Sequence, residues 1–413
     1  MKTVADVVAW RLCTGCGACA SICPEGKIHL ADFVDDGIRP VLKSGSCGSC
    51  EDCLKVCPGY KTAPVSFPGN GDSIPELKEG WGQILEIWEG YAEHPALRYH
   101  GSSGGLISAL SLYCIEKKKM EGVLHIGADE EKPFINKTVF SHTLSDLLSR
   151  TGSRYAPASP CEGLNRIESA SDSCLFIGKP CDVAGLKKAQ ILRPSLEKKV
   201  GLAIGIFCAG TPSTKGILDL LSRLNVEPGK IENVRYRGRG WPGRFQVELK
   251  DGQVKEKSYA ESWGFVERYR PYRCYLCPDG TSQFADISCG DPWYRAIKEG
   301  EPGYSLVLIR TEKGRKIFQE AREAGYLSAD QVSAEVLIKS QKEMLAKKGA
   351  VWGRLFAMTV CRIPTPGYRG FSLFKNWCGL TPQEKSRSIF GTIYRVVQRK
   401  YFRPMNLGRM KTS

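Results

Sequence analysis

Two short cysteine runs near the amino terminus carry the residues best suited to chemistry. CTGCGACASICP occupies residues 13–24, and CGSCEDCLKVCP occupies residues 47–58. Each run places four thiols at the spacing C-x2-C-x2-C-x3-C and closes on a proline. A zinc site usually takes two Cys pairs separated by a longer loop, whereas three closely spaced thiolates can hold one face of an iron–sulfur cube. The two runs therefore predict iron–sulfur chemistry.

The spacing is that of bacterial [4Fe–4S] ferredoxins, in which the fourth Cys of each run ligates the other cluster. The first cluster is accordingly assigned to Cys13, Cys16, Cys19 and Cys57. The second cluster is assigned to Cys47, Cys50, Cys53 and Cys23. Gly15, Gly17 and Gly48 would let backbone amides approach the sulfides closely. Two neighbouring clusters pass one electron at a time.

The composition supports metal ligation in a reducing compartment. The chain has 413 residues, 42% hydrophobic content and 18 cysteines, which fall in tight groups rather than in the spread frameworks of secreted domains. The first residues lack the apolar core of a signal peptide, and the longest apolar run, from Val200, is about half of the roughly 20 residues that a membrane helix needs. We expect a cytoplasmic protein, with a peripheral position at the membrane as an open alternative.

The net charge of +15 is concentrated at the carboxyl end. From Gln331 onward there are 16 Lys and Arg against three Glu, so 16 − 3 = +13 of the charge lies there. Residues 386–402 predict a basic amphipathic helix, which either packs on the body or docks to anionic lipid or an acidic partner. Because the other 330 residues are close to neutral, we do not expect nucleic-acid binding. The apolar and basic positions of this helix are Ile389, Ile393, Val396, Val397, Tyr401, Arg395, Arg399 and Lys400.

The chain divides into three parts by pattern. Residues 1–75 hold the cysteine repeat and predict an α+β ferredoxin domain, and a Pro- and Gly-rich linker follows. From about residue 81 to 330, apolar strands alternate with helical stretches, which predicts an α/β body. Asp251-Gly252 marks a hairpin turn within it. Residues 331–413 form the basic helical extension. The expected strands of the body include residues 84–92, 122–128, 173–180 and 201–210, and the expected helix covers residues 104–119.

Four strings of the body, in this order, resemble the family of coenzyme F420 hydrogenase and dehydrogenase beta subunits. They are HGSSGGLISAL from His100, TGSRYAPASP from Thr151, IGKPCDVAGL from Ile177 and CYLCPDGTSQFADISCGDPW from Cys274. The resemblance implies an N-terminal domain over 81–160 and a C-terminal domain over 161–330. It also implies a flavin-binding body in which FAD exchanges a hydride with a two-electron substrate and single electrons with iron–sulfur clusters.

The same resemblance implies which residues bind FAD. Gly104 and Gly105 open a helix whose free N–H groups could hold a phosphate. The other expected cofactor-binding residues supply hydroxyl donors, positive charges and a ring to stack on. They are Ser102, Ser103, Ser153, Arg154, Tyr155 and Lys179, the last of them placed near the flavin ring. No catalytic acid or base stands out, and only His100 is a candidate proton donor.

A third cluster is predicted in the body. Cys274 and Cys277 form a C-x-x-C pair that needs two further thiolates, and Cys181, Cys208 and Cys289 are the candidates. The family pattern favours Cys181 and Cys208, so these four residues are expected to hold a third [4Fe–4S] cluster. Zinc has the same ligand count but cannot relay electrons. The remaining cysteines are expected to be small buried hydrophobes, namely Cys114, Cys161, Cys174, Cys289, Cys361 and Cys378.

The stretch GRGWPG at residues 238–243 matches the dinucleotide-binding pattern G-x-G-x-x-G in sequence but not in its surroundings. A strand follows it instead of a helix, so we predict a loop and no Rossmann fold. Arg235, Arg237 and Arg239 are expected to line a site for an acidic ligand there, with a solvated basic loop as the alternative.

These features predict an iron–sulfur flavoprotein oxidoreductase that moves electrons between a two-electron substrate, coenzyme F420 or similar, and ferredoxin-type clusters. Its expected partner is a redox protein or ferredoxin. Two alternatives stay open: a reductase in bacterial surface polysaccharide biosynthesis, and an electron-transfer subunit without chemistry of its own. The sequence leaves open the substrate and the direction of electron flow.

Overall fold

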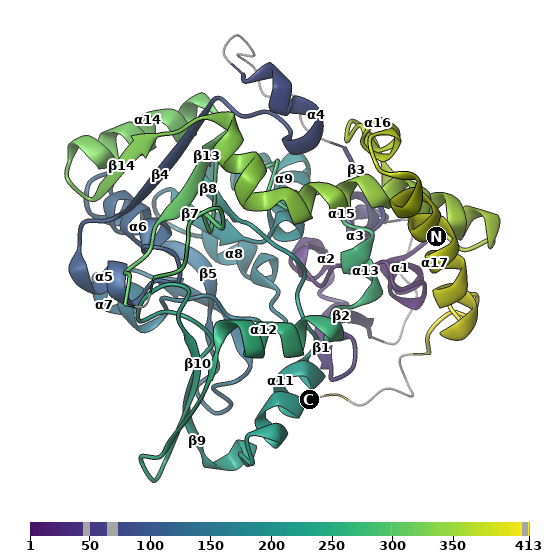
Figure 1. The fold of residues 1–413 in the computed structure, drawn as a ribbon, viewed down its shortest axis with the longest axis horizontal. Helices are drawn as coiled ribbons and strands as arrows, with labels where there is room; N and C mark the ends of the chain where they lie inside the picture. The colour runs from purple at the N-terminus through teal and green to yellow at the C-terminus, as the bar shows by residue number, and fades with distance from the viewer. Residues whose placement is uncertain (44–49, 64–72, 299, 407–411, 413) are drawn as a thin grey trace.

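The computed structural model describes residues 1–43, 50–63, 73–298, 300–406 and 412. Its centre is an eight-stranded mixed sheet, with the N-terminal domain and the C-terminal helices lying together at one side (Figure 1). The ferredoxin-like domain packs directly against the body.

The N-terminal domain is small and built around the cysteine runs. Thr3 caps its first helix in a capping box with Asp6. The domain's apolar residues Val7, Val8 and Leu12 belong to the same buried core as Phe176 and Ala203 of the body, so the two parts share one hydrophobic core. Its elements are α1 (Val4–Ala9), α2 (Ala18–Ile22), β1 (Ile28–Phe33), β2 (Gly37–Leu42), α3 (Asp52–Lys55) and β3 (Lys61–Thr62).

The strand order of the central sheet is β14-β4-β13-β12-β8-β7-β5-β6. The four central strands β12, β8, β7 and β5 are parallel, and the flanking strands pair antiparallel. The four strands predicted from apolar runs are confirmed as β4 (Glu86–Ala92), β5 (Val123–Ala128), β7 (Cys174–Gly178) and β8 (Val200–Ile206). The other strands of the sheet are β6 (Asn136–Ser141), β12 (Ile287–Gly290), β13 (Ser305–Ile309) and β14 (Leu327–Gln331).

Helices cover both faces of this sheet. Leu175 and Phe176 are consecutive in β7 and lie in different buried clusters, which is the alternation that a doubly covered sheet requires. The helices and short 3-10 turns of this part are η2 (Pro75–Leu77), α4 (Lys78–Trp81), α5 (Pro95–His100), α6 (Leu106–Glu116), α7 (Leu144–Ser149), η3 (Pro160–Gly163), α8 (Leu164–Glu168), α9 (Pro180–Leu192), α10 (Pro194–Lys199) and α14 (Glu312–Glu323).

A smaller three-stranded sheet forms a separate lobe of the body. The predicted hairpin is confirmed, with β10 and β11 antiparallel and Gly252 at φ +82° in the turn. Residues 236–243 form the predicted loop between β9 and β10. The elements are α11 (Thr214–Arg223), η4 (Pro228–Lys230), β9 (Ile231–Arg235), β10 (Arg244–Leu249), β11 (Val254–Ser258), α12 (Tyr259–Val266), η5 (Glu267–Tyr269) and α13 (Tyr272–Tyr275).

The C-terminal extension is mostly helical and packs against the N-terminal domain. Its strand β15 pairs in parallel with β3, and the amide of Met405 donates to the carbonyl of Ala9 at 2.8 Å. The predicted amphipathic helix is present, but it ends at Gln398, before Arg399, Lys400 and Tyr401. Its buried apolar residue is Val396. No helix in the described part of the chain is both long and apolar enough to cross a membrane. The elements are α15 (Ala334–Val360), β15 (Gly367–Tyr368), α16 (Leu373–Cys378) and α17 (Pro382–Gln398).

Candidate functional site

A first cavity in the N-terminal domain is lined by four thiols. They come from the loop before α2, from α2 itself and from the segment just after α3, and the cavity has an empty volume of about 320 Å³, including the part open to solvent. The amide of Gly15 donates to the sulfur of Cys13 at 3.4 Å, as expected for a backbone wrapped around a thiolate. The cysteines of this first thiol cavity are Cys13, Cys16, Cys19 and Cys57.

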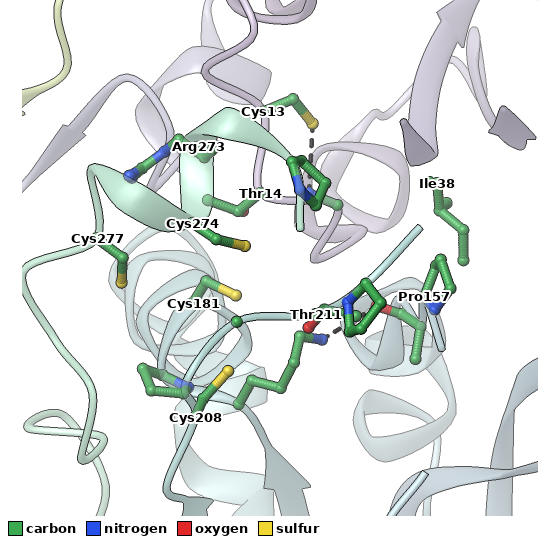
Figure 2. Close-up of a pocket in the computed structure, with 18 of the residues that line it drawn as sticks. Cys13, Thr14, Ile38, Pro157, Cys181, Cys208, Thr211, Arg273, Cys274 and Cys277 are labelled. Carbon is green, nitrogen blue, oxygen red and sulfur yellow. Dashed lines mark hydrogen bonds between the residues drawn. The ribbon is translucent and has the colours of Figure 1, made fainter. Parts of the chain in front are cut away.

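A second cavity lies between the N-terminal domain and the body (Figure 2). It has an empty volume of about 660 Å³, including the part open to solvent. The sulfur atoms of Cys181, Cys208 and Cys274 point into it in Figure 2, and Cys277 lies beside them. The cysteines of this second thiol cavity are Cys13, Cys181, Cys208, Cys274 and Cys277.

Local structure explains how the body thiols meet. Cys181 stands in the first turn of α9 after Pro180, and Cys208 follows the end of β8. Because the carboxyl ends of adjacent parallel strands lie at one edge of a sheet, the segments after β7 and β8 converge there. Cys274 belongs to the short helix α13, and Cys277 lies just after it.

Cys289 does not line the second thiol cavity. It lies inside strand β12, where it is 3% exposed among apolar side chains. Of the two candidates that the sequence left open, Cys208 is therefore the one that reaches the cavity.

The two thiol cavities share a wall, because Cys13 lines both of them. The body holds this wall in place by hydrogen bonds to the backbone beside the cysteines. Arg273, 5% exposed, donates to the carbonyl of Leu12 at 2.8 Å, and Ser159 donates to the carbonyl of Gly15 at 2.7 Å. The amide of Cys161 donates to the carbonyl of Cys16 at 3.0 Å.

Gly17 shows how closely the two parts approach. Its φ is +89°, and a Cβ there would lie 2.8 Å from the amide nitrogen of Glu162 in η3. Only glycine permits this contact, because another residue would need both an unfavourable φ and a displaced backbone. The N-terminal domain is therefore docked on the body rather than loosely tethered to it.

Burial disfavours ionisation of two thiols of the second cavity, those of Cys208 and Cys277. Burial raises the pKa of Cys208 to about 11, although the nearby Lys347 opposes the shift. Burial likewise raises the pKa of Cys277, and Lys347 and Arg273 oppose it. Iron would supply the positive charge that these thiolates need.

The described residues contain no group of three or more Cys, His, Asp or Glu close enough together to hold a single metal ion. A four-iron cube instead spreads its four thiolates over separate corners. None of the described cysteines forms a disulfide.

The second predicted cluster is placed only in part, because Cys47 and Gly48 lie outside the described residues. Cys50 is exposed, and Cys23 and Cys53 are half-buried.

Six cysteines outside the predicted clusters are expected to be buried hydrophobes. This expectation is wrong for Cys378, which is exposed because the face of α16 that carries it is not covered. Cys361 is half-buried.

In the loop of residues 102–105, which the sequence predicts to bind flavin, the serine side chains are hydrogen-bonded to other parts of the protein. The hydroxyl of Ser102 accepts a hydrogen bond from the amide of Ser153 at 2.5 Å, and Ser103 donates to Asp291 at 2.6 Å. Gly104 and Gly105 have positive φ values of 67° and 71°. No side chain caps the amino end of α6, which follows Gly105.

Arg154 is also committed to the protein. It donates to the side chain of Asn136 at 2.5 Å and to the carbonyls of Pro133, Ile135 and Val234. Its role in the structure is to join β6 to β9. Tyr155 lies instead in an aromatic group, with ring centroids 4.8 to 6.3 Å away, made up of Trp263, Tyr236 and Tyr259.

Lys179 lines the second thiol cavity rather than the loop of Ser102. Its ammonium group donates to the carboxylate of Asp182 at 2.7 Å and to the carbonyl of Ala158 at 3.2 Å. Burial opposes its charge, but Asp182, Cys181 and Cys208 together raise the pKa of Lys179. The side chain therefore keeps its positive charge beside Cys181.

The arginines of residues 235–239 have different environments, so the expectation of a shared ligand site is wrong for Arg237. Arg237 is 2% exposed and forms two hydrogen bonds with Asp291, at 2.7 and 2.9 Å. Trp241 and Ser103 also donate to Asp291. Burial opposes ionisation of Asp291, but Arg237 and these donors hold its pKa below its usual value. Asp291 lies inside the sequence string CGDPW, which by itself gives no sign of this role.

Two family models for the coenzyme F420 hydrogenase/dehydrogenase beta subunit match the body. The N-terminal model matches residues 87–165 and the C-terminal model matches residues 171–335. The chain belongs to the family of coenzyme F420 hydrogenase/dehydrogenase beta subunits. A model for a 4Fe-4S dicluster domain matches residues 12–60, so this family member also carries a ferredoxin-like iron–sulfur domain.

Individual relatives agree with this family assignment. The chain is 24% identical over 357 residues to one of the subunits of the F420H2 dehydrogenase of Methanosarcina mazei, covering 84% of this chain and 93% of the relative. It is 25% identical over 328 residues to the coenzyme F420-dependent sulfite reductase of Methanocaldococcus jannaschii, covering 76% of this chain but 46% of that relative. A chain of the F420-reducing [NiFe] hydrogenase complex from Methanosarcina barkeri shares its fold, with a TM-score of 0.54 and 23% identity over 70% of this chain and 97% of the other.

Proposed function

We propose that this family member moves electrons between a two-electron substrate at FAD in the body and [4Fe–4S] clusters in the N-terminal domain, with coenzyme F420 or a similar carrier as the substrate. The observation that carries the proposal is that Cys13 lines both thiol cavities. Cofactors in these two cavities would be direct neighbours, which is the arrangement that single-electron transfer needs.

The proposed ligands follow from which thiols share a cavity. The first thiol cavity would hold the first N-terminal cluster, and the second would hold a third cluster, since both have room and four free thiols. The ligands of this third cluster would be Cys181, Cys208, Cys274 and Cys277. The second N-terminal cluster would use Cys23, Cys50 and Cys53 together with Cys47, which lies outside the described residues.

FAD would convert between two-electron transfer with the substrate and one-electron transfer with the clusters. Parts of the predicted residue set fit a dinucleotide: the uncapped amino end of α6 after Gly104 and Gly105 suits a phosphate, and the ring of Tyr155 suits stacking. The side chains of Ser102, Ser103 and Arg154 would support the loop through their protein contacts. Lys179 would keep a positive charge at the thiol side of the site.

Anaerobic reduction tests the proposal. Reduced coenzyme F420 or reduced ferredoxin, added to the anaerobically purified chain, should bleach a flavin spectrum without any other protein. Iron and sulfide should each approach about twelve per chain, for three clusters of four. If neither donor bleaches the flavin, the chain is an electron-transfer subunit that needs a catalytic partner.

We also propose that the exposed face of α17 docks on an anionic membrane surface. Phe390, Tyr394 and Val397 form a stripe along this helix and are 67%, 65% and 63% exposed. From Lys385 to the end of the chain there are eight Lys and Arg and no Asp or Glu. Exposed aromatic side chains next to a basic surface are typical of helices that lie in a lipid interface.

Vesicle sedimentation tests this docking. The full chain should bind phosphatidylglycerol vesicles more tightly than phosphatidylcholine vesicles, and salt should weaken the binding. Replacing Phe390 and Tyr394 together by serine should reduce binding, whereas Val254→Ser, at an exposed apolar residue of β11, should not. Equal binding by wild type and the double variant would show that this face does not dock on the membrane.

A further inference from the structure

A group of basic side chains without carboxylate partners lies where β9 meets the end of α5. Arg235 and Arg239 are close enough to His100 to lower its pKa, after burial, which is the largest cause. A guanidinium nitrogen of Arg235 donates to the carbonyl of His100 at 3.4 Å. The side chains come from segments more than 130 residues apart in the sequence, so tertiary structure alone brings them together.

The positive charges in this group are not neutralised by the protein. In the described part of the chain, none of His100, Arg235 and Arg239 forms an ion pair, whereas Arg237 in the same stretch pairs with Asp291. Burial lowers the pKa of Arg235, and repulsion from Arg239 and Arg154 lowers it further. Like charges held together without a counter-ion are unfavourable, so a bound anion would stabilise this group.

Two buried hydrogen-bond groups of the same residues also have no partner. They are Nε of Arg235 and Nδ1 of His100, both inaccessible to solvent. An unmade hydrogen bond at a buried charged group costs about 1–3 kcal/mol or more, so such groups usually face a ligand or an ordered water. A ligand with several acceptor oxygens and negative charge would complement the guanidinium groups that have no carboxylate partner.

We propose that His100, Arg235 and Arg239 form a binding site for a phosphate-class oxyanion. The site deepens the proposed function, because it would hold either the diphosphate of the flavin or the acidic tail of a phosphorylated carrier. Arg235 supplies charge from β9, Arg239 supplies it from the exposed loop, and His100 supplies a nitrogen that becomes a second donor when protonated. The two possible sources share the same chemistry and differ in what the protein loses when the site is removed.

Binding of inorganic pyrophosphate tests the site directly. The anaerobically purified full chain is titrated calorimetrically at low salt, before and after removal of its flavin. Arg235→Gln should weaken binding about 10- to 100-fold, the loss expected for one charged hydrogen bond. Arg244→Gln is the matched control, since Arg244 is an exposed arginine of neighbouring β10 that already pairs with Glu256. Arg235→Lys, which keeps the charge, should lose less affinity than Arg235→Gln.

Flavin content and steady-state kinetics then separate the two sources. If the flavin diphosphate occupies the site, Arg235→Gln lowers flavin per chain, and wild type binds pyrophosphate only after flavin removal. If the carrier tail occupies it, flavin content is unchanged, the KM for reduced carrier rises and pyrophosphate competes with the carrier. Unchanged pyrophosphate affinity in Arg235→Gln, or an equal loss in Arg244→Gln, overturns the proposal. Neither result depends on whether reduced F420 bleaches the flavin, which tests the proposed function separately.

Discussion

The second thiol cavity and the stretch of residues 235–243 are both assembled from segments far apart in the sequence, yet their reactive groups are treated differently. In the cavity, thiols from α9, the end of β8 and α13 face a common space. In residues 235–243, Arg237 is enclosed by protein acceptors while Arg235 and Arg239 are not. The comparison shows that reactive side chains brought together by the fold do not by themselves form a ligand site. A ligand site also needs side chains whose charge or hydrogen-bonding groups have no partner in the protein.

Loss of a cavity thiol should give the largest effect. Cys277→Ser should remove the third cluster, because a serine hydroxyl is a poor replacement for a thiolate ligand. Iron per chain should fall by about four, with the signals of the N-terminal clusters retained. Iron analysis and electron paramagnetic resonance of the reduced protein measure this. Cys289→Ser is the control, since Cys289 lies outside the cavity. An equal loss of iron in Cys289→Ser would show that Cys289, rather than Cys208, ligates the third cluster.

The next largest effect should come from breaking the internal ion pair. Asp291→Asn leaves the guanidinium of Arg237 buried at 2% exposure without its counter-charge. Removing one partner of a buried pair costs about 3–5 kcal/mol in the free energy of unfolding. Anaerobic urea denaturation measures the change, with Asp251→Asn in the exposed hairpin turn as the control. A loss as small as that of the control would mean that Arg237 is free to bind a ligand after all.

A smaller effect is expected in the pH dependence of anion binding. The pKa of His100 lies below the ordinary 6.5, because burial and then Arg235 and Arg239 oppose its protonation. A bound oxyanion raises this pKa, so binding takes up a proton and affinity rises as the pH falls below about 6.5, by at most about tenfold per pH unit.

Sulfate is the probe for this measurement, because its charge is constant over the range. Calorimetry from about pH 7.5 to about pH 5.5, a range that spans the ordinary histidine pKa, should show the rise in wild type and a flatter profile in His100→Gln. The same slope in both proteins would remove His100 from the site.

The smallest effect should come from Ser103→Ala. Its hydroxyl donates to Asp291, which keeps its bonds from Arg237 and Trp241, so the free energy of unfolding should fall by only about 1 kcal/mol. Flavin per chain should stay within about twofold of wild type. A large loss of flavin with an unchanged free energy of unfolding would show that the hydroxyl of Ser103 binds the cofactor, as the sequence predicted.

The sequence by itself determined the parts of this protein whose signals are local. The cysteine spacing fixes the ferredoxin-like domain because ligand geometry within a run depends on a few neighbouring residues. Strands β4, β5, β7 and β8 of the central sheet and the Asp251-Gly252 hairpin were also predictable, since apolar runs and turn residues act over short distances.

Only the tertiary structure decided which residues face a ligand and which face the protein. Cys208 and Cys289 both stand near strand ends in the sequence, but Cys289 lies within β12 and points into the core. Arg235 and Arg237 are two residues apart, and the position of Asp291, more than 50 residues later, neutralises Arg237 and not Arg235. The physical reason is that burial and charge pairing depend on contacts between distant segments, which spacing along the chain does not encode.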